Sequence, residues 1–69
     1  MTNAKQYREA YGISADEMAK ALGISRPTYM SRENGTSEFT REEMNKFVET
    51  IKSKLTETLP VNIESIFFN

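Results

Sequence analysis

The chain has 69 residues, nine of them Lys or Arg and ten Asp or Glu, and its formal net charge is −1. A chain of this length forms one small domain, which buries only about 60% of the surface that the unfolded chain exposes. It contains no cysteine and no histidine, which excludes disulfides, thiolate metal sites and the most common general base. No apolar run approaches the roughly 18 residues that cross a bilayer, and the N-terminus does not resemble a signal peptide. We therefore expect a single cytoplasmic domain over residues 1–69, without membrane association, cofactor or small-molecule ligand.

Four segments begin with the pattern of a helix N-cap. The side chain of an N-cap Ser, Thr or Asn accepts a bond from the third helical N–H, and a Glu or Gln at that third position bonds back. Three segments carry this full capping box: Asn3 with Gln6, Ser14 with Glu17, and Thr40 with Glu43. Ser25 caps the remaining one, and Pro27 follows it in the first turn, where no N–H is needed. The caps predict a first helix that runs to about Ala10 and further helices over about 14–22, 25–34 and 41–57.

The C-terminal part of the chain continues the helical pattern. One face of the fourth predicted helix carries apolar residues at helical spacing, namely Met44, Phe47, Val48, Ile51 and Leu55. Leu59-Pro60 ends this helix, and Asn62 can cap a final short one. That last helix places three side chains toward the core: Ile63, Ile66 and Phe67. Since no segment alternates as a strand does, the sequence predicts a compact, all-α domain of five helices.

The segment from Ser14 to Gly35 is the most informative for function. Gly23 supplies the left-handed backbone that a tight turn after a helix requires. The small Ala19 allows the next helix to approach closely, and Ile24 fills the angle between the two helices. A helix, a turn of three to four residues and a second helix form a DNA-reading motif, in which the second helix lies in the major groove.

The residues of this segment resemble a known family. Residues 16–25 read Asp-Glu-Met-Ala-Lys-Ala-Leu-Gly-Ile-Ser, and Thr28-Tyr29 and Glu33-Asn34-Gly35 follow. This pattern resembles the Cro/repressor (XRE-type) helix-turn-helix family of phages and bacteria, and the ending over residues 63–68 is similar to the last helix of many small members. The resemblance implies a lambda-repressor-like fold of five helices, usually dimeric, that regulates transcription by occupying an operator.

The resemblance also implies roles for particular residues. It implies that four residues contact bases, namely Arg26, Pro27, Thr28 and Ser31. It implies that five contact phosphates, namely Ser14, Arg32, Thr36, Ser37 and Arg41. Arg26 is the strongest candidate for reading a base, because one guanidinium can bond O6 and N7 of guanine together. Arg8 and Glu33 stand at positions that form a structural, partly buried ion pair in the family.

Several features depart from the family pattern. Ala15 stands where a glutamine usually bonds phosphate, Ser31 stands where Arg, Gln or Lys is frequent, and Glu38 adds a negative charge to a loop that should approach DNA. Residues 14–37 sum to no net charge, which favours weak phosphate binding. Met30 is expected on the outer face of its helix, where a thioether suits a protein contact.

Two functions therefore stay open from the sequence. The first is a homodimeric regulator that binds double-stranded operator DNA. The second is a protein-binding antagonist, an antirepressor, which uses the helix-turn-helix surface to block a partner repressor of a phage. An enzyme is not expected, because the residues supply no nucleophile–base pair, metal set or phosphate-binding glycine loop.

Smaller features have simple structural interpretations. Tyr29 is expected in the core rather than stacked on a base. The acidic pairs Asp16-Glu17 and Glu42-Glu43 are expected to cap helices and to favour their dipoles. Phe67 and Phe68 are adjacent, so one is expected in the core. The other is expected to be either a loose end or part of a dimer contact, and the dimer contact is favoured slightly.

Overall fold

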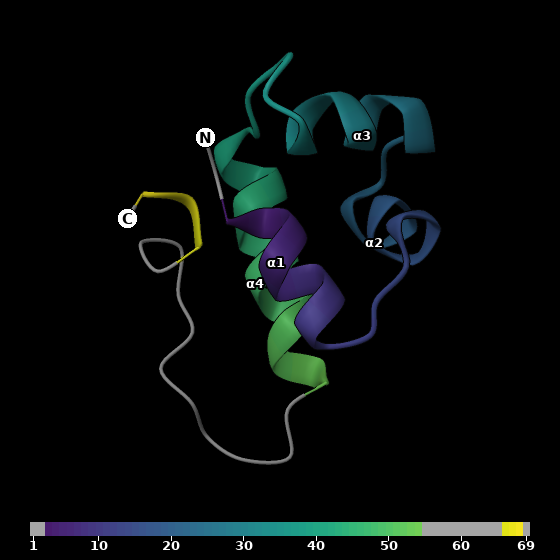
Figure 1. Cartoon of the computed structure of the whole chain (residues 1–69), viewed down its shortest axis with the longest axis vertical. Helices are drawn as coiled ribbons and strands as arrows, with labels where there is room; N and C mark the ends of the chain where they lie inside the picture. Colours follow the sequence, from purple (N-terminus) through teal and green to yellow (C-terminus); the bar gives the residue numbers. More distant parts are fainter. Residues whose placement is uncertain (1–2, 55–65, 69) are drawn as a thin grey trace.

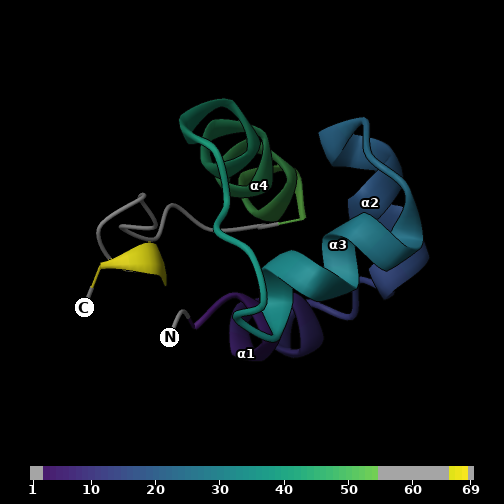
Figure 2. The ribbon, with the colours of Figure 1, turned by 90° about the horizontal axis from the view of Figure 1, so that it is seen from above.

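The structure of the protein, a computed structural model, describes residues 3–54 and 66–68. It contains four helices, α1 (Ala4–Ala10), α2 (Ala15–Leu22), α3 (Arg26–Glu33) and α4 (Arg41–Ser53) (Figure 1). α2 packs against both α3 and α4. Seen from above, α2 lies on one side of the molecule and residues 66–68 on the other (Figure 2). Over the described residues the fold is all-helical, as the sequence predicts.

The predicted fifth helix is not confirmed. Asn62 and Ile63 lie outside the described residues, as do Leu55 and Leu59-Pro60. Ile66 and Phe67 are helical and buried, with exposed fractions of 0% and 6%, whereas Phe68 is 63% exposed. The expectation that one of the two adjacent phenylalanines enters the core is thus confirmed.

Hydroxyl side chains begin three of the four helices. Ser14, Ser25 and Thr40 have extended backbones, and their side chains accept the N–H of the third helical residue at 3.1, 3.3 and 3.1 Å. The capping box at Thr40 is complete, because the carboxylate of Glu43 also accepts the N–H of Thr40 at 3.1 Å. At Ser14 only the N-cap half forms, since the carboxylate of Glu17 instead pairs with Lys54 at 2.9 Å.

The capping box predicted for Asn3 and Gln6 is wrong. Asn3 precedes α1, but its ψ angle is 15°, far from the extended backbone of a capping residue, and its side chain makes no cap bond. Its backbone N–H instead donates to the carbonyl oxygen of Ile66 at 2.9 Å. A contact with a distant residue, which the local sequence does not reveal, therefore holds the start of α1.

Aromatic rings form the centre of the core around Phe39, in the segment between α3 and α4. Its ring makes edge-to-face contacts with Tyr29, Phe47 and Phe67, at centroid distances of 6.0, 6.2 and 4.9 Å. Pairs in this arrangement contribute about 0.5–1.5 kcal/mol beyond their buried area. Tyr29 is fully buried, as predicted, and Met30 is half-buried against the core rather than on the outer face of α3.

Within residues 3–54 and 66–68, no helix is both long and apolar enough to cross a bilayer.

Candidate nucleic-acid interface

A tight turn joins α2 to α3. Gly23 has a φ of 76°, its N–H donates to the carbonyl of Lys20 at 3.1 Å, and the N–H of Ile24 donates to Ala19 at 3.0 Å. This pair of bonds is the Schellman arrangement, in which a left-handed residue ends a helix. Ala19 is 2% exposed, so α2 approaches its neighbours closely at this point. The result is two helices joined by Gly23, Ile24 and Ser25.

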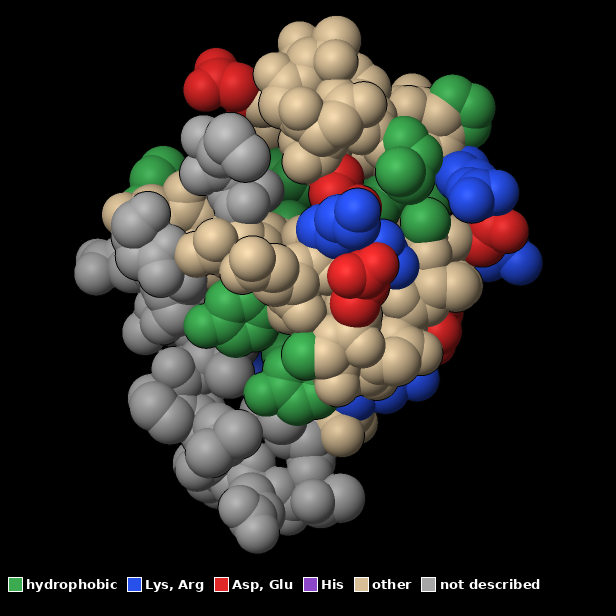
Figure 3. Space-filling model, viewed as in Figure 1, with side chains coloured by type: hydrophobic (Ala, Val, Ile, Leu, Met, Phe, Trp, Pro, Cys, Tyr) green, Lys and Arg blue, Asp and Glu red, His purple; other side chains and the backbone are tan. Residues whose placement is uncertain are grey.

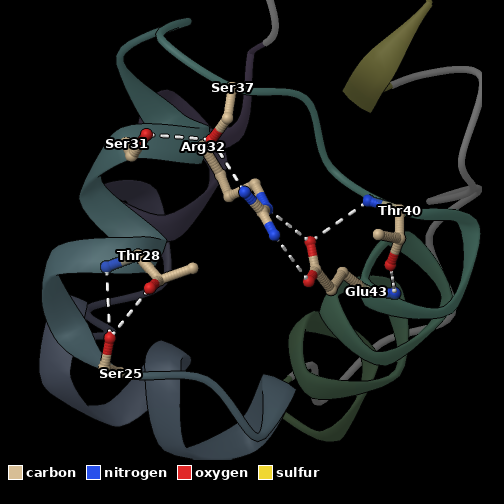
Figure 4. A network of polar contacts seen from close by, with 7 residues as sticks. All are labelled: Ser25, Thr28, Ser31, Arg32, Ser37, Thr40 and Glu43. Carbon is tan, nitrogen blue, oxygen red and sulfur yellow. Dashed lines mark hydrogen bonds and ion pairs between the residues drawn. The ribbon is translucent and has the colours of Figure 1, made fainter.

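The first turn of α3 lies at the surface. Arg26 and Pro27 are exposed and Thr28 is half-buried. The hydroxyl of Ser25 accepts the N–H of Thr28 and donates its own hydrogen to the hydroxyl oxygen of Thr28 at 2.9 Å (Figure 4). The hydrogen of the Thr28 hydroxyl is therefore not used in this contact. This turn presents a guanidinium, a proline ring and a hydroxyl to an approaching partner.

The last turn of α3 is instead fixed to α1 by a buried polar cluster. Arg8 donates through Nε to Oε2 of Glu33 at 2.9 Å and through Nη2 to Oε1 at 3.1 Å. A third guanidinium nitrogen, Nη1, donates to the carbonyl of Ile13 at 2.9 Å, and Tyr29 donates its hydroxyl to Glu33 at 2.6 Å. The side chains of Arg8 and Glu33 are only 10% and 3% exposed. The structure thus brings Arg8 and Glu33 together in the pair that the resemblance implies.

The charges of this cluster are stabilised by its hydrogen bonds. Burial is the largest influence on the carboxyl of Glu33 and raises its pKa, but the bonds from Arg8 and Tyr29 outweigh it and lower the pKa below its ordinary value. The same bond to Glu33 raises the pKa of Arg8, and burial raises the pKa of Tyr29. Glu33 and Arg8 are therefore ionised at neutral pH and Tyr29 is neutral.

Arg32 bridges α3 to α4 (Figure 4). Its Nε donates to Oε1 of Glu43 at 2.9 Å, its Nη2 lies 3.4 Å from Oε2, and its Nη1 donates to the hydroxyl of Ser37 at 2.7 Å. The two charged side chains are 21% and 10% exposed. Burial raises the pKa of Glu43, but the bonds from Arg32 and the N–H of Thr40 outweigh it and hold the pKa below its ordinary value. The resemblance implied a phosphate contact for Arg32, whereas the structure engages its guanidinium within the fold.

The segment after α3 is held by short polar contacts. The side-chain oxygen of Asn34 accepts the N–H of Thr36 at 3.0 Å and its hydroxyl at 2.7 Å. The hydroxyls of Ser31 and Ser37 lie 2.9 Å apart, and the N–H of Ser37 donates to the carbonyl of Ser31 at 3.1 Å. One hydrogen bond between two hydroxyls uses only one of their two hydrogens. The pair retains a donor suited to a phosphate oxygen.

The nine residues implied in DNA contact differ in accessibility. Five are exposed: Ser14, Arg26, Pro27, Thr36 and Arg41. Four are half-buried: Thr28, Ser31, Arg32 and Ser37. They lie at the N-cap of α2, on α3, in the segment after α3 and at the start of α4.

The sequence was compared with models of known protein families. A family model described as helix-turn-helix matches residues 5–61. The chain belongs to this helix-turn-helix family. The resemblance to the Cro/repressor (XRE-type) proteins is confirmed by this match, and the family is one of DNA-binding regulators, which are not typically enzymes. Neither a curated protein nor a solved structure matches the chain.

For a helix-turn-helix protein, the charge on this surface is unusually mixed. Nε of Arg26 lies 3.6 Å from Oδ1 of Asp16, and the two side chains are 61% and 66% exposed. Lys46 pairs with Glu42 at 3.2 Å on α4. Figure 3 shows basic and acidic side chains interspersed on the face that it views, rather than basic side chains gathered together. Both arginines of α3, Arg26 and Arg32, are paired with acids, which departs from the uniformly basic surface typical of phosphate binding.

Sequence reasoning missed the pairing of Asp16 with Arg26. It assigned Asp16 only to the first turn of α2, where an acid favours the helix dipole. The two residues are ten positions apart and on different helices. The sequence does hold a signal, because a helix-turn-helix brings the starts of its two helices near each other, so charges at the two starts can be checked for pairing.

Proposed function

We propose that the protein is a sequence-specific transcription regulator of the Cro/repressor type, from a phage or prophage, which occupies an operator through α3. The observation that carries this proposal is the exposed first turn of α3, where Arg26 and Pro27 project from a fixed helix-turn-helix frame. In this motif the first residues of the second helix meet the base edges in the major groove.

The proposal divides the contacts into two groups. Arg26, Pro27, Thr28 and Ser31 contact bases. Phosphates are contacted by the polar groups around them, namely Ser14, Thr36, Ser37 and Arg41. Arg32 is left out of the second group, because its guanidinium is bonded to Glu43 and Ser37. Arg41 is the exposed first residue of α4 and supplies a phosphate contact of full charge.

The regulator acts as a homodimer on a two-fold symmetric site. Two copies of α3 then enter successive major grooves about 34 Å apart. Phe68 supports a contact between copies, since it is a large apolar side chain that is 63% exposed next to the buried Phe67.

The test is selection of a random duplex library by the purified protein at low salt. Enrichment of a symmetric motif, with affinity reduced by about 1–3 kcal/mol on Arg26→Ala, supports an operator-binding regulator. Lys52→Ala is the matched control: it removes one charge from the last turn of α4, at the far end of that helix from α3 (Figure 1). Both variants should fold, because both residues are exposed.

A second candidate function is an antirepressor, and the mixed charge of the α3 surface favours it. Arg26 is paired with Asp16 and Arg32 with Glu43, so α3 itself offers little uncompensated positive charge to phosphates. An antirepressor presents such a surface to the basic DNA-reading face of a partner repressor. Selection without enrichment, by folded protein at high concentration, together with a stable complex with a partner repressor, would establish this function in place of the first.

A further inference from the structure

The ion pair between Asp16 and Arg26 joins the two helices of the motif at their exposed starts. Asp16 lies in the first turn of α2 and Arg26 is the first residue of α3. Their closest charged atoms are 3.6 Å apart, and each side chain is more than half exposed. Surface pairs of this kind contribute little to stability. The effect of the Asp16–Arg26 pair therefore lies in the position that it gives to the guanidinium of Arg26.

We propose that Asp16 is a positioning residue that sets the base specificity of Arg26, so that the protein requires a guanine at the operator position facing the start of α3. This inference rests on the proposed DNA-binding function and extends it. Asp16 is not among the nine residues implied in DNA contact, and guanine is the base that the operator must contain.

The chemistry of the guanidinium supports this role. Arginine carries five N–H donors in a planar fork. The closest approach of Asp16 is to Nε, so the two terminal Nη groups remain as donors for a further partner. Two parallel donors on these groups match O6 and N7 of guanine, the commonest specific contact of arginine with DNA.

Asp16 also acts against a competing contact. An unrestrained arginine on this surface can turn to the phosphate backbone, which attracts cations regardless of sequence. The carboxylate of Asp16 holds the guanidinium by attraction and repels phosphate oxygens that approach the same place. The pair therefore lowers binding to arbitrary DNA and raises discrimination at one base pair.

Glu17 provides the control that separates position from charge. It lies beside Asp16 in the first turn of α2 and is also an exposed acid, but it pairs with Lys54 at 2.9 Å and not with Arg26. Asp16→Asn and Glu17→Gln remove the same charge from the same helical turn. Only the first removes the partner of Arg26.

The experiment measures affinity for the selected operator and for versions in which each base pair is replaced in turn. Arg26→Ala identifies the base pair that Arg26 reads, and wild-type protein is expected to prefer guanine there by about tenfold or more. Asp16→Asn is expected to reduce this preference by about threefold or more while binding random duplex about twofold more tightly. Glu17→Gln is expected to show the gain in random binding without the loss of preference. Melting temperatures close to wild type for all three variants exclude unfolding as the cause.

Several outcomes overturn the proposal and leave the DNA-binding function intact. One is an operator without guanine at the position that Arg26 reads. Another is an unchanged preference in Asp16→Asn, or an equal loss in Glu17→Gln. A third is a changed preference at a different base pair, which would mean that Asp16 reads a base itself. Failure of the wild-type protein to select any duplex is a separate result, because it rejects the proposed function as well.

Discussion

The two ends of α3 differ in how their polar side chains are used. At its end, Glu33 is bonded to Arg8 and Tyr29. Arg32, next to it, is bonded to Glu43 and Ser37, and these contacts are partly or largely buried. At its start, Arg26 has one exposed partner at 3.6 Å. Charged groups at one end fix the helix in place, and those at the other remain available to a ligand. In such a small domain, whether a charged side chain is held within the fold therefore depends on which turn of the helix carries it.

The largest expected effect tests the fixed end. Glu33→Ala leaves the guanidinium of Arg8 buried without its carboxylate and removes the acceptor of the Tyr29 hydroxyl. Breaking a buried pair in this way costs about 3–5 kcal/mol, a large part of the stability of a small domain. Urea unfolding followed by circular dichroism measures this loss. Glu9→Ala, on the exposed side of α1, should change the free energy of unfolding by less than about 0.5 kcal/mol. A loss below about 1 kcal/mol for Glu33→Ala would contradict the contrast between the two ends.

The next effect separates Arg32 from Arg41. Arg32→Ala removes the bridge from α3 to α4 and is expected to cost about 2 kcal/mol of stability, because the largely buried carboxylate of Glu43 loses its charged partner. Arg41→Ala, on the exposed first residue of α4, should leave stability unchanged.

In operator binding the order should be reversed, so that Arg41→Ala has the larger effect and Arg32→Ala the smaller one. Titrations at several salt concentrations should show the slope of log affinity against log salt smaller by about 1 for Arg41→Ala. The slope should be unchanged for Arg32→Ala, measured well below its melting temperature. A reduced slope for Arg32→Ala would return Arg32 to the set of phosphate contacts.

Local patterns in the sequence predicted much of the fold around α3. The caps at Ser25 and Thr40, the left-handed Gly23 and the burial of Tyr29 depend on residues that are close in the chain. Spacing rules and capping chemistry apply directly to such features. The all-α class follows from them, because α2, α3 and α4 each begin at a cap that the local sequence predicts.

Contacts between distant residues were not predicted by those patterns. Arg32 and Glu43 are eleven positions apart, and their pairing depends on how α3 packs against α4. Sequence reasoning gave Arg32 a phosphate contact because the family resemblance implies one at its position. The bond from Asn3 to Ile66 spans nearly the whole chain and replaced an expected local cap. Such pairings require the packing of the helices to be known first.

Acid provides a smaller test of the fixed end. The pKa values of Glu33 and Glu43 are lowered in the folded protein, from an ordinary value of 4.5, because their hydrogen bonds outweigh burial. As pH falls below 4.5, the unfolded chain takes up protons first, so the stability that these groups contribute at neutral pH is lost progressively as pH approaches their lower folded values. The melting temperature, measured from pH 7 to pH 3, should therefore decrease as the pH falls below about 4.5. Glu43→Gln should start less stable at pH 7 and show a shallower fall, and parallel curves for the two proteins would contradict the assignment.

The smallest expected effect concerns the start of α3. In a double-mutant cycle of Asp16→Ala and Arg26→Ala, the coupling free energy of unfolding should be below about 0.5 kcal/mol, since both side chains are more than half exposed. Measured by chemical denaturation at two salt concentrations, the little coupling present should decrease with salt. A coupling above about 1 kcal/mol would place this pair with the buried pairs at the other end, because a surface contact rarely reaches that strength. Arg26 would then be a structural residue, and a base contact would require breaking part of the fold. A small coupling instead leaves the guanidinium oriented by Asp16 and able to bond a base without loss of stability.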